Sequence, residues 1–436
     1  MLAAAIPFVF LHPNYQPSLR VGRADVDLSD LAILVVVLAA LAGGRAAAAS
    51  LRGARPAWLG LGALAVVVAA ATLRGTAEPA YPLSTHAVSA AKWIEYMLLA
   101  PAAVALCRRP GSWRVPAAAV LGWGCVASTF GLLQFADLAG DRIDHTPGGR
   151  RKPSFLGDHD LAALSAALLL YALIVLARRA RSPLERRLAL AAGIAGVVGM
   201  VIGGAFDSYL GAILATAVLL WTLRPSRGRV LLVAAVLAVV LVGLFGIRSQ
   251  AVADGLKFLG LKQGTGNAGA HVQSYRQRAL LAYIGGRIFL AHPLDGVGFA
   301  GSQDPFAYRP YLADARRRFV QPPEAFPSQA HPWGVQNAYV QAAADAGILG
   351  PLALLAALLA PPLLALRRGS GDLRLLGAAA GLLVLGTWNG YGLVPGLPVD
   401  ALTWLGAGAA VASVTVEARR YRCAVPESSV AGASPA

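Results

Sequence analysis

The fold of this chain is decided by the stretch SYRQRALLAYIGGRIFLAHPLDGVGFAG at residues 274–301, followed by AHPWGVQNAYVQAAADAGILG at residues 330–350. Both segments border a polar, Arg-rich run in the one long hydrophilic gap of an otherwise apolar sequence. Residues 274–291 have a helical period, with Leu280 and Ile284 on one face and arginines on its edges. This pattern predicts an amphipathic helix that lies along a membrane surface.

The composition around this gap is that of a membrane protein. Apolar residues make up 57% of the 436 residues and charged residues only 14%, whereas soluble domains carry about 25% charge. Repeated apolar runs of roughly 16 to 22 residues are long enough to cross a hydrocarbon core. The sequence therefore predicts an all-α polytopic integral membrane protein with about twelve transmembrane helices. They are expected at 1–11, 30–47, 57–73, 86–107, 115–136, 160–177, 188–206, 208–223, 230–247, 348–366, 374–392 and 396–415.

The distribution of arginines predicts the orientation. The net charge of +16 comes from short loops between apolar runs, a pattern that argues against nucleic-acid binding and follows the positive-inside rule. We expect both termini in the cytoplasm and an inner membrane of a bacterium, since the high Ala, Gly and Arg content is typical of GC-rich bacterial genomes. The arginine-rich loops are 45–55, 108–114, 178–187, 224–229, 367–374 and 419–422.

The same rule divides the chain into four parts. Residues 1–247 hold the first nine predicted helices, and residues 248–347 form a large external loop. Residues 348–415 hold the last three helices, and residues 416–436 are predicted to be a disordered cytoplasmic tail.

Cysteine usage and the amino terminus add two expectations. Cys107, Cys125 and Cys423 have no metal-ligand spacing and do not share an external segment, so we predict no disulfide and no metal site. The start MLAAAIPFVF has no basic residues and is not a convincing cleavable signal.

Five segments, in this order, carry a family resemblance. They are VDLSDLAIL at 26–34, RRKPSFLGDHDLAALSAALLL at 150–170, GGAFDSYLGAILA at 203–215, RALLAYIGGRIFLAHPLDGVGFAG at 278–301 and QNAYVQAAADAGILG at 336–350. Together they resemble the O-antigen ligase and O-antigen polymerase family of membrane glycosyltransferases. On this match Arg150 and Arg278 take the places of family arginines, and His159 takes the place of a family Asn.

The chain also departs from the family pattern. Gln336 stands where the family has a His directly before Asn, the Arg of a Ser-Arg-Gly motif is absent, and Ala282 stands where Trp is frequent. The family His is the proposed base of related ligases, and Gln cannot take a proton. The base is then His331, His159 or Asp345, or this member is inactive or follows another mechanism.

The resemblance implies the transfer of a glycan from a polyprenyl-diphosphate carrier to an acceptor hydroxyl on a glycan or a lipid, without a cofactor. Such a reaction needs cations for the diphosphate, a base for the hydroxyl proton and a groove for the lipid. Arginine suits a diphosphate because its planar fork donates hydrogen bonds in pairs. The catalytic candidates are His331, Arg278 and His159. The diphosphate- or glycan-binding candidates are Arg150, Arg151, Arg276, Arg287, Gln336, Asn337, Gln341 and Asp207.

Several of these residues have simpler interpretations. Asn337 and Gln341 are four residues apart on one helix face and can serve helix–helix hydrogen bonding. Lys92 and Glu95 are three residues apart and can pair with each other inside the membrane. The whole chain can also be a multi-helix transporter or flippase of lipid-linked or small substrates, although it has no obvious internal repeat.

Overall fold

The computed structural model is an α-helical protein: 75% of it is helix. Among the residues that the structure describes, the one sheet is a hairpin in which β1 (Ser18–Val21) and β2 (Ala24–Asp27) pair antiparallel. The structure describes residues 1–21, 24–109, 111–143, 151–178, 180–249, 253 and 274–416. Arg150 and the tail after residue 416 lie outside them.

All twelve apolar runs coincide with helices in this structure. The helices are α1 (Leu2–Val9), α2 (Leu28–Ala42), α3 (Gly44–Leu51), α4 (Arg55–Gly75), α5 (Leu83–Met97), α6 (Leu99–Leu106), α7 (Arg114–Phe135), α8 (Asp158–Arg178), α9 (Pro183–Gly203), α10 (Phe206–Leu223), α11 (Arg227–Ile247), α13 (Ser274–Ala291), α14 (Pro305–Arg318), α15 (Ala338–Ala346), α16 (Leu349–Arg368), α17 (Gly371–Thr387) and α18 (Pro398–Thr415).

The number of helices that can cross a membrane is smaller than predicted. Among the described residues, seven helices are long and apolar enough: α4, α7, α8, α9, α10, α11 and α16. An eighth span results if α2 and α3, which are bent by 100° relative to each other, count as one. The class of helical membrane protein is therefore supported, but a count of twelve spans is not confirmed. α1 has only 8 residues, about 12 Å of helix.

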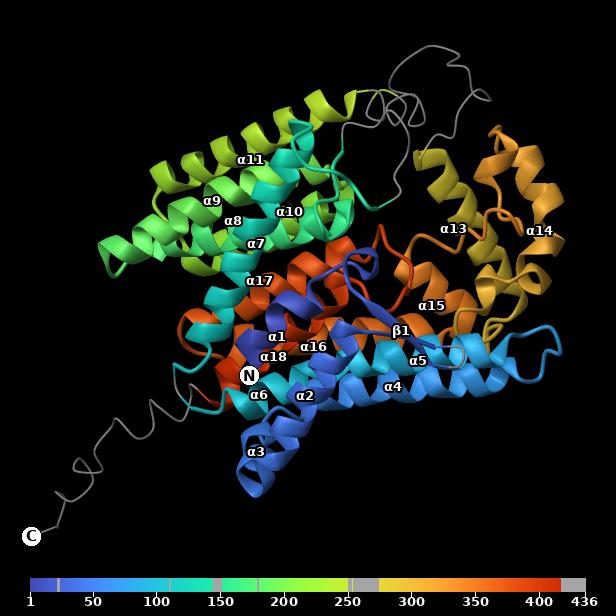
Figure 1. The fold of residues 1–436 in the computed structure, drawn as a ribbon, viewed down its shortest axis with the longest axis horizontal. Coiled ribbons are helices and arrows are strands. Elements are labelled where there is room, and N and C mark those ends of the chain that lie inside the picture. The colour runs from blue at the N-terminus through green and yellow to red at the C-terminus, as the bar shows by residue number, and fades with distance from the viewer. Residues whose placement is uncertain are drawn as a thin grey trace, which may run out of the picture.

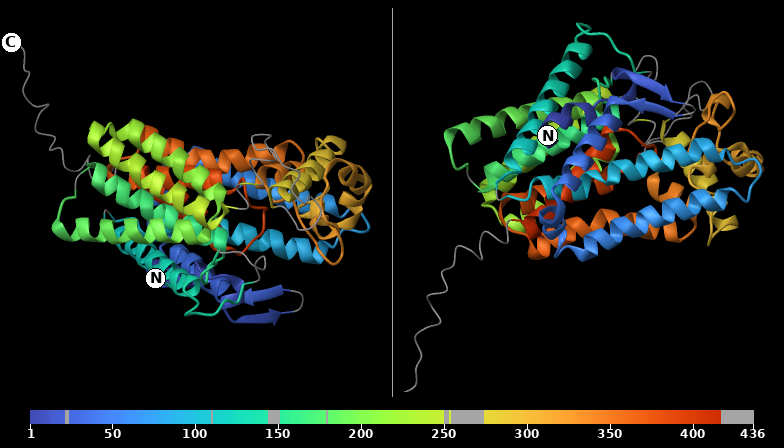
Figure 2. Two further views of the ribbon diagram at one scale, coloured as in Figure 1. Left: turned by 90° about the horizontal axis from the view of Figure 1, so that it is seen from above. Right: turned by 60° about the horizontal axis from the view of Figure 1, so that its bottom comes forward.

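Helix α8 runs through the middle of the bundle and defines its two ends. Of the apolar stretch of α8, 78% is buried inside the protein. At its last turn, Arg178 pairs with Glu185 at the start of α9 and with Asp372 at the start of α17. The corner between α8 and α9 lies at one extreme of the molecule, and α13 and α14 lie at the other (Figures 1 and 2). We call the end at Arg178 the basic end and the end at the first turn of α8 the loop end.

Glycines allow the helices at the loop end to approach one another closely. A Cβ atom on Gly203 of α9 would lie 2.6 Å from the carbonyl oxygen of Asp158. A Cβ atom on Gly211 of α10 would lie 2.1 Å from the carbonyl oxygen of Leu383 in α17. Small residues at helix contacts are the usual means of close packing in membranes. They fix the starts of α8 and α10 against their neighbours.

The amphipathic helix α13 forms as predicted, but its apolar face does not face lipid. Leu280, Leu281 and Ile284 are at most 2% exposed, and they belong to a small core that also contains Tyr308 of α14 and Phe326. Because α14 and the following segment cover this face, α13 is part of a small folded unit. The apolar face of α13 is therefore covered by protein, and the expectation that α13 lies along a membrane surface stays a prediction.

This unit is fastened to the tip of the α4–α5 hairpin by three contacts. The Tyr81 hydroxyl donates to the carbonyl of Phe299 at 2.7 Å. The ring of His86 meets the carboxylate of Asp304 at 2.7 Å, and Arg74 pairs with Asp295 at 2.7 Å. The segment after α13 is thus held at a fixed position over the bundle.

The pairing of Lys92 also differs from the expectation. Its ammonium group lies 2.6 Å from a carboxylate oxygen of Asp27 and 3.2 Å from one of Asp30. Glu95 is not its ion-pair partner. The Lys92 charge on α5 is therefore compensated by carboxylates at the start of α2, because the β-hairpin positions Asp27 next to α5.

The two ends and the loop charges together generate a topology prediction. Leu294, next to the α4–α5 tip, is 75% exposed, and Leu184, at the basic end, is 65% exposed. In a cysteine-free background, we expect Leu294→Cys to react with a membrane-impermeant maleimide in intact cells. We expect Leu184→Cys to react only after permeabilisation. The reverse labelling pattern would overturn the predicted orientation.

Candidate functional site

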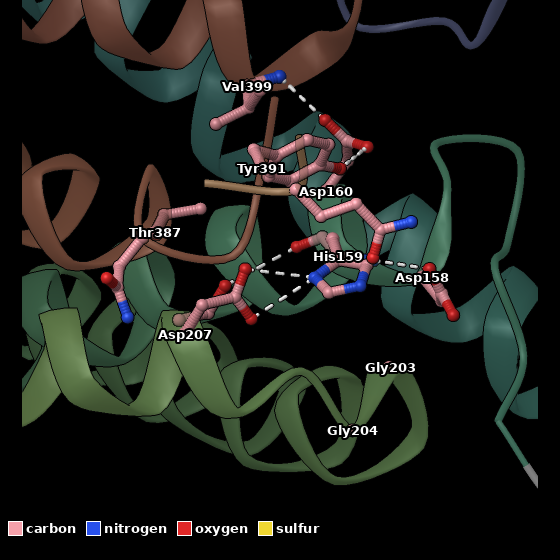
Figure 3. A network of polar contacts seen from close by, with 12 residues as sticks. Asp158, His159, Asp160, Gly203, Gly204, Asp207, Thr387, Tyr391 and Val399 are labelled. Atoms are coloured by element: carbon pink, nitrogen blue, oxygen red, sulfur yellow. Dashed lines mark hydrogen bonds and ion pairs between the residues drawn. The ribbon is translucent and has the colours of Figure 1, made fainter. Parts of the chain in front are cut away.

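A chain of polar contacts joins three helices at the loop end. The Nδ1 atom of His159, in the first turn of α8, lies 2.9 and 3.1 Å from the two carboxylate oxygens of Asp207 at the start of α10. The Nε2 atom of His159 lies 2.9 Å from Nη2 of Arg278 on α13. Figure 3 shows the His159–Asp207 part of this network.

The hydrogen bonds assign the tautomer of His159. A guanidinium can only donate, so Nε2 accepts from Arg278 and carries no proton. Nδ1 then carries the proton and donates a hydrogen bond to the Asp207 carboxylate. The lone pair of a neutral imidazole is therefore directed at α13, and a buried carboxylate holds the ring in that orientation.

Two further arginines lie beside this network. Arg151 donates from Nε to the Gly203 carbonyl at 2.8 Å, and its Nη2 lies 2.6 Å from the Asp158 carboxylate. Arg248, directly after α11, donates from Nη1 to the Gly204 carbonyl at 2.9 Å. Two consecutive carbonyls at the end of α9 thus hold two guanidinium groups side by side.

Gly204 is required for this arrangement. Its φ of +58° lies in the left-handed region, and a Cβ atom there would approach the side chains of Arg248 at 3.2 Å and Arg151 at 3.4 Å. A side chain at this position would be strained and would push the two arginines apart.

The site carries more positive than negative charge. Three guanidiniums, those of Arg151, Arg248 and Arg278, face the carboxylates of Asp158 and Asp207. Burial, and after it the charge of Arg151, lower the pKa of Arg248 to about 10. Among the described residues Arg248 has no carboxylate partner, and its guanidinium stacks over the Phe206 ring at 5.1 Å. Such crowding of cations is relieved by an anion that binds between them.

A second set of contacts locks the segment between α17 and α18 onto the start of α8. The carboxylate of Asp160 accepts hydrogen bonds from the Tyr391 hydroxyl and, at 2.7 Å, from the Val399 backbone amide (Figure 3). The Tyr391 ring packs edge-on against His159 with centroids 5.1 Å apart. Tyr391 therefore covers one side of the imidazole, while Arg278 of α13 contacts its Nε2 atom.

The amide side chains that were predicted to bind a ligand mostly make hydrogen bonds within the protein. Gln336 accepts from Nε of Arg278 at 3.3 Å and so belongs to the network. Asn337 caps α15 by accepting from the amides of Tyr339 and Val340. Gln341 is buried and accepts from the Leu393 amide at 2.6 Å. The structural interpretation thus accounts for the contacts of Asn337 and Gln341.

Three other candidates lie apart from this network. His331 stacks on Trp333 with ring centroids 6.2 Å apart. Arg287 lies over the Tyr311 ring at 5.8 Å, and the Nε atom of Arg276 is buried without a hydrogen-bond partner. Within the described part of the chain, no contact joins these three to His159. Arg150 lies outside the described residues.

The sequence interpretation missed Arg248. It grouped this residue with the large loop, although Arg248 directly follows α11, which has the highest mean hydropathy of the seven candidate spans. In the predicted orientation this helix end is external, where the positive-inside rule disfavours arginine, so an arginine directly after such a helix is a usable signal for a function.

Comparisons with known proteins add nothing to this picture: no protein-family profile and no curated sequence matches the chain.

Asp345 is buried, and its hydrogen bonds stabilise the fold. It accepts from the backbone amides of Ala300 at 2.9 Å and Ser302 at 3.0 Å. Gln341 donates a third hydrogen bond at 3.2 Å. These bonds hold the glycine-rich turn after α13. Burial nevertheless raises the pKa of Asp345 to about 6.

This raised pKa predicts a pH dependence of stability. The folded state holds the Asp345 proton between the ordinary pKa near 4 and about 6, whereas the unfolded state releases it. Stability should therefore fall as the pH rises through this window, by about 1.4 kcal/mol for each pH unit. Thermal unfolding in detergent from pH 4 to 7 measures this slope, and Asp345→Asn should make it shallower by the share of this one carboxyl group. Equal slopes for both proteins would contradict the assignment.

Proposed function

We propose that this chain is an O-antigen ligase-like glycosyltransferase. It moves a glycan from a polyprenyl-diphosphate carrier to an acceptor hydroxyl of a glycan or lipid, as a ligase or polymerase of cell-surface polysaccharide. The observation that carries the proposal is the convergence of Arg151, Arg248 and Arg278 around the His159–Asp207 pair. This arrangement offers cations for a diphosphate and a base for a hydroxyl in one place.

The proposal includes a topology. The chain crosses the inner membrane of a bacterium with about twelve helical segments, both termini lie in the cytoplasm, and the loop end faces outward. The donor's lipid tail then stays in the membrane while its diphosphate reaches the starts of α8 and α10. Residues 274–347 cover this position from outside.

The three arginines would bind the diphosphate of the donor. Charge-assisted bonds from planar guanidiniums match phosphate oxygens and are stronger than neutral hydrogen bonds. They stabilise the charge that develops on the leaving group as the bond between the anomeric carbon and the diphosphate oxygen breaks.

His159 would act as the general base. Its Nε2 lone pair is covered by Arg278 until a diphosphate draws this guanidinium away. The exposed Nε2 then takes the proton of the acceptor hydroxyl as the hydroxyl oxygen bonds to the anomeric carbon. Asp207 stabilises the resulting imidazolium through Nδ1. The products are the extended glycan, a polyprenyl diphosphate and a proton that His159 later releases.

The role of Gln336 follows from the same geometry. In the resemblance this position belongs to a histidine base, but here the side chain accepts from Nε of Arg278. Gln336 would hold Arg278 in place while His159, from another helix, supplies the imidazole. The loss of the family histidine is thereby compatible with activity.

A transporter or flippase of lipid-linked or small substrates is the second candidate. The observation that favours it is the pairing of Lys92 with Asp27 and Asp30, since charged groups within membrane helices often mark an ion or substrate path. An inactive family member is the third candidate, because of Gln336.

A transfer assay with purified donor tests the proposal. We expect His159→Ala to lower the rate by about 100-fold or more, as loss of a general base does, and Arg278→Ala to lower it by at least about tenfold. Arg287→Ala, on the same helix but over Tyr311, is the matched control for Arg278. His331→Ala is the control for the histidine. Both controls should retain activity.

The assay separates the candidates. Activity lost in His331→Ala but kept in His159→Ala would contradict His159 as the base. Movement of the intact donor across vesicle membranes without glycan transfer would favour the transporter. No transfer by the wild type and a gain in Gln336→His would identify an inactive member.

A further inference from the structure

Two adjoining cavities lie at the basic end, far from the arginine site. The larger, of about 620 Å³, lies between the ends of α7, α8, α9 and α17. The smaller, of about 120 Å³, continues between α1, α7, α8, α17 and α18. Six residues line both: Trp113, Ala117, Leu121, Tyr171, Leu373 and Leu376. The two cavities therefore form one passage from the helix ends into the bundle.

The packing of α7 explains why this space is open. In its second half α7 contacts α8 tightly: Gly124 and Gly131 leave no room for a Cβ atom beside Leu168 and Leu161. The hydroxyl groups of Ser128 and Ser165 lie 3.2 Å apart. In its first half α7 lines the two cavities instead, through Ala117 and Leu121.

The passage is amphipathic. Its inner part is lined by apolar side chains such as Phe10, Leu170 and Leu405. Its mouth is lined by Arg114, Arg178, Arg181, Glu185 and Asp372. Arg178 and Arg181 share the carboxylate of Asp372 at 3.1 Å. Three guanidiniums thus face two carboxylates, which leaves a positive charge at the mouth.

We propose that this passage binds an anionic glycerophospholipid, with the headgroup phosphate at Arg114 and Arg181 and one acyl chain inside. Arg181 has a side chain that is 65% exposed and can turn toward a phosphate. Arg114 has no carboxylate partner in the described ranges. Apolar space of this size in a membrane bundle is filled by hydrocarbon, because an empty cavity loses dispersion contacts.

The dimensions favour a phospholipid over the polyprenyl carrier. The outer cavity of about 620 Å³ lies in the usual range of small-molecule pockets, roughly 300–1,000 Å³, and is large enough for part of a lipid. The inner cavity, of about 120 Å³, is much smaller than the outer one of about 620 Å³, so it suits the end of one unbranched acyl chain better than a branched isoprenoid. The ligand would stabilise the contact between α7 and α8 at the end opposite to the proposed site of transfer.

Native mass spectrometry of the purified protein tests this proposal. The protein is mixed with phosphatidylglycerol, phosphatidylethanolamine and a polyprenyl phosphate at equal mole fractions. We expect the wild type to retain phosphatidylglycerol preferentially. The double variant Arg114→Gln/Arg181→Gln should retain about tenfold less or lower. Ala117→Phe, which narrows the passage, should also reduce retention.

Arg187→Gln is the matched control, because it removes one charge at the same end from a residue that does not line the passage. It should retain phosphatidylglycerol like the wild type. Equal retention of the two phospholipids, preference for polyprenyl phosphate, or unchanged retention in both the double variant and Ala117→Phe would each overturn the proposal. The assay does not depend on glycan transfer, so its outcome is independent of the proposed enzyme function.

Discussion

The buried carboxylate of Asp207 is the constraint on which the loop end depends. Asp207 is only 4% exposed, and an uncompensated charge at such a position would cost several kcal/mol. Compensation comes from His159 on α8, which in turn accepts from Arg278 on α13. One buried charge therefore holds three helices, far apart in the sequence, in a fixed relation. Gly390 completes the packing, since a Cβ atom there would lie 2.4 Å from Asp207.

Contacts around the His159–Asp207–Arg278 network hold this arrangement in place. Asp160 fastens the start of α18 to α8, and the Tyr81 and His86 contacts fasten the unit that contains α13 to the α4–α5 tip. Arg278 thus reaches His159 from a folded unit that is anchored at several points. The function that we propose requires only that the Arg278 side chain changes partner, and its long stem permits this without movement of a helix.

Much of this fold could be predicted from the sequence, because apolar periodicity reports directly on helices. The number of spans could not, since length and hydropathy do not show that α2 and α3 bend apart or that the run at 86–107 is divided into α5 and α6. The site was predicted in part. The predicted residues His159, Asp207, Arg278 and Gln336 lie in one network of contacts. Sequence spacing does not show, however, that Arg287 lies over the Tyr311 ring or that Asp27 pairs with Lys92. Those contacts depend on tertiary approach.

The most direct test of the central claim is the affinity of the purified protein in nanodiscs for a polyprenyl diphosphate. Arg248 provides the sharpest variant, because its place in the site follows from the structure and not from the resemblance. Our account predicts that Arg248→Ala weakens binding of the diphosphate by at least about tenfold. It also predicts tighter binding of the diphosphate than of the monophosphate by the wild type. An unchanged affinity in Arg248→Ala would contradict the arginine site.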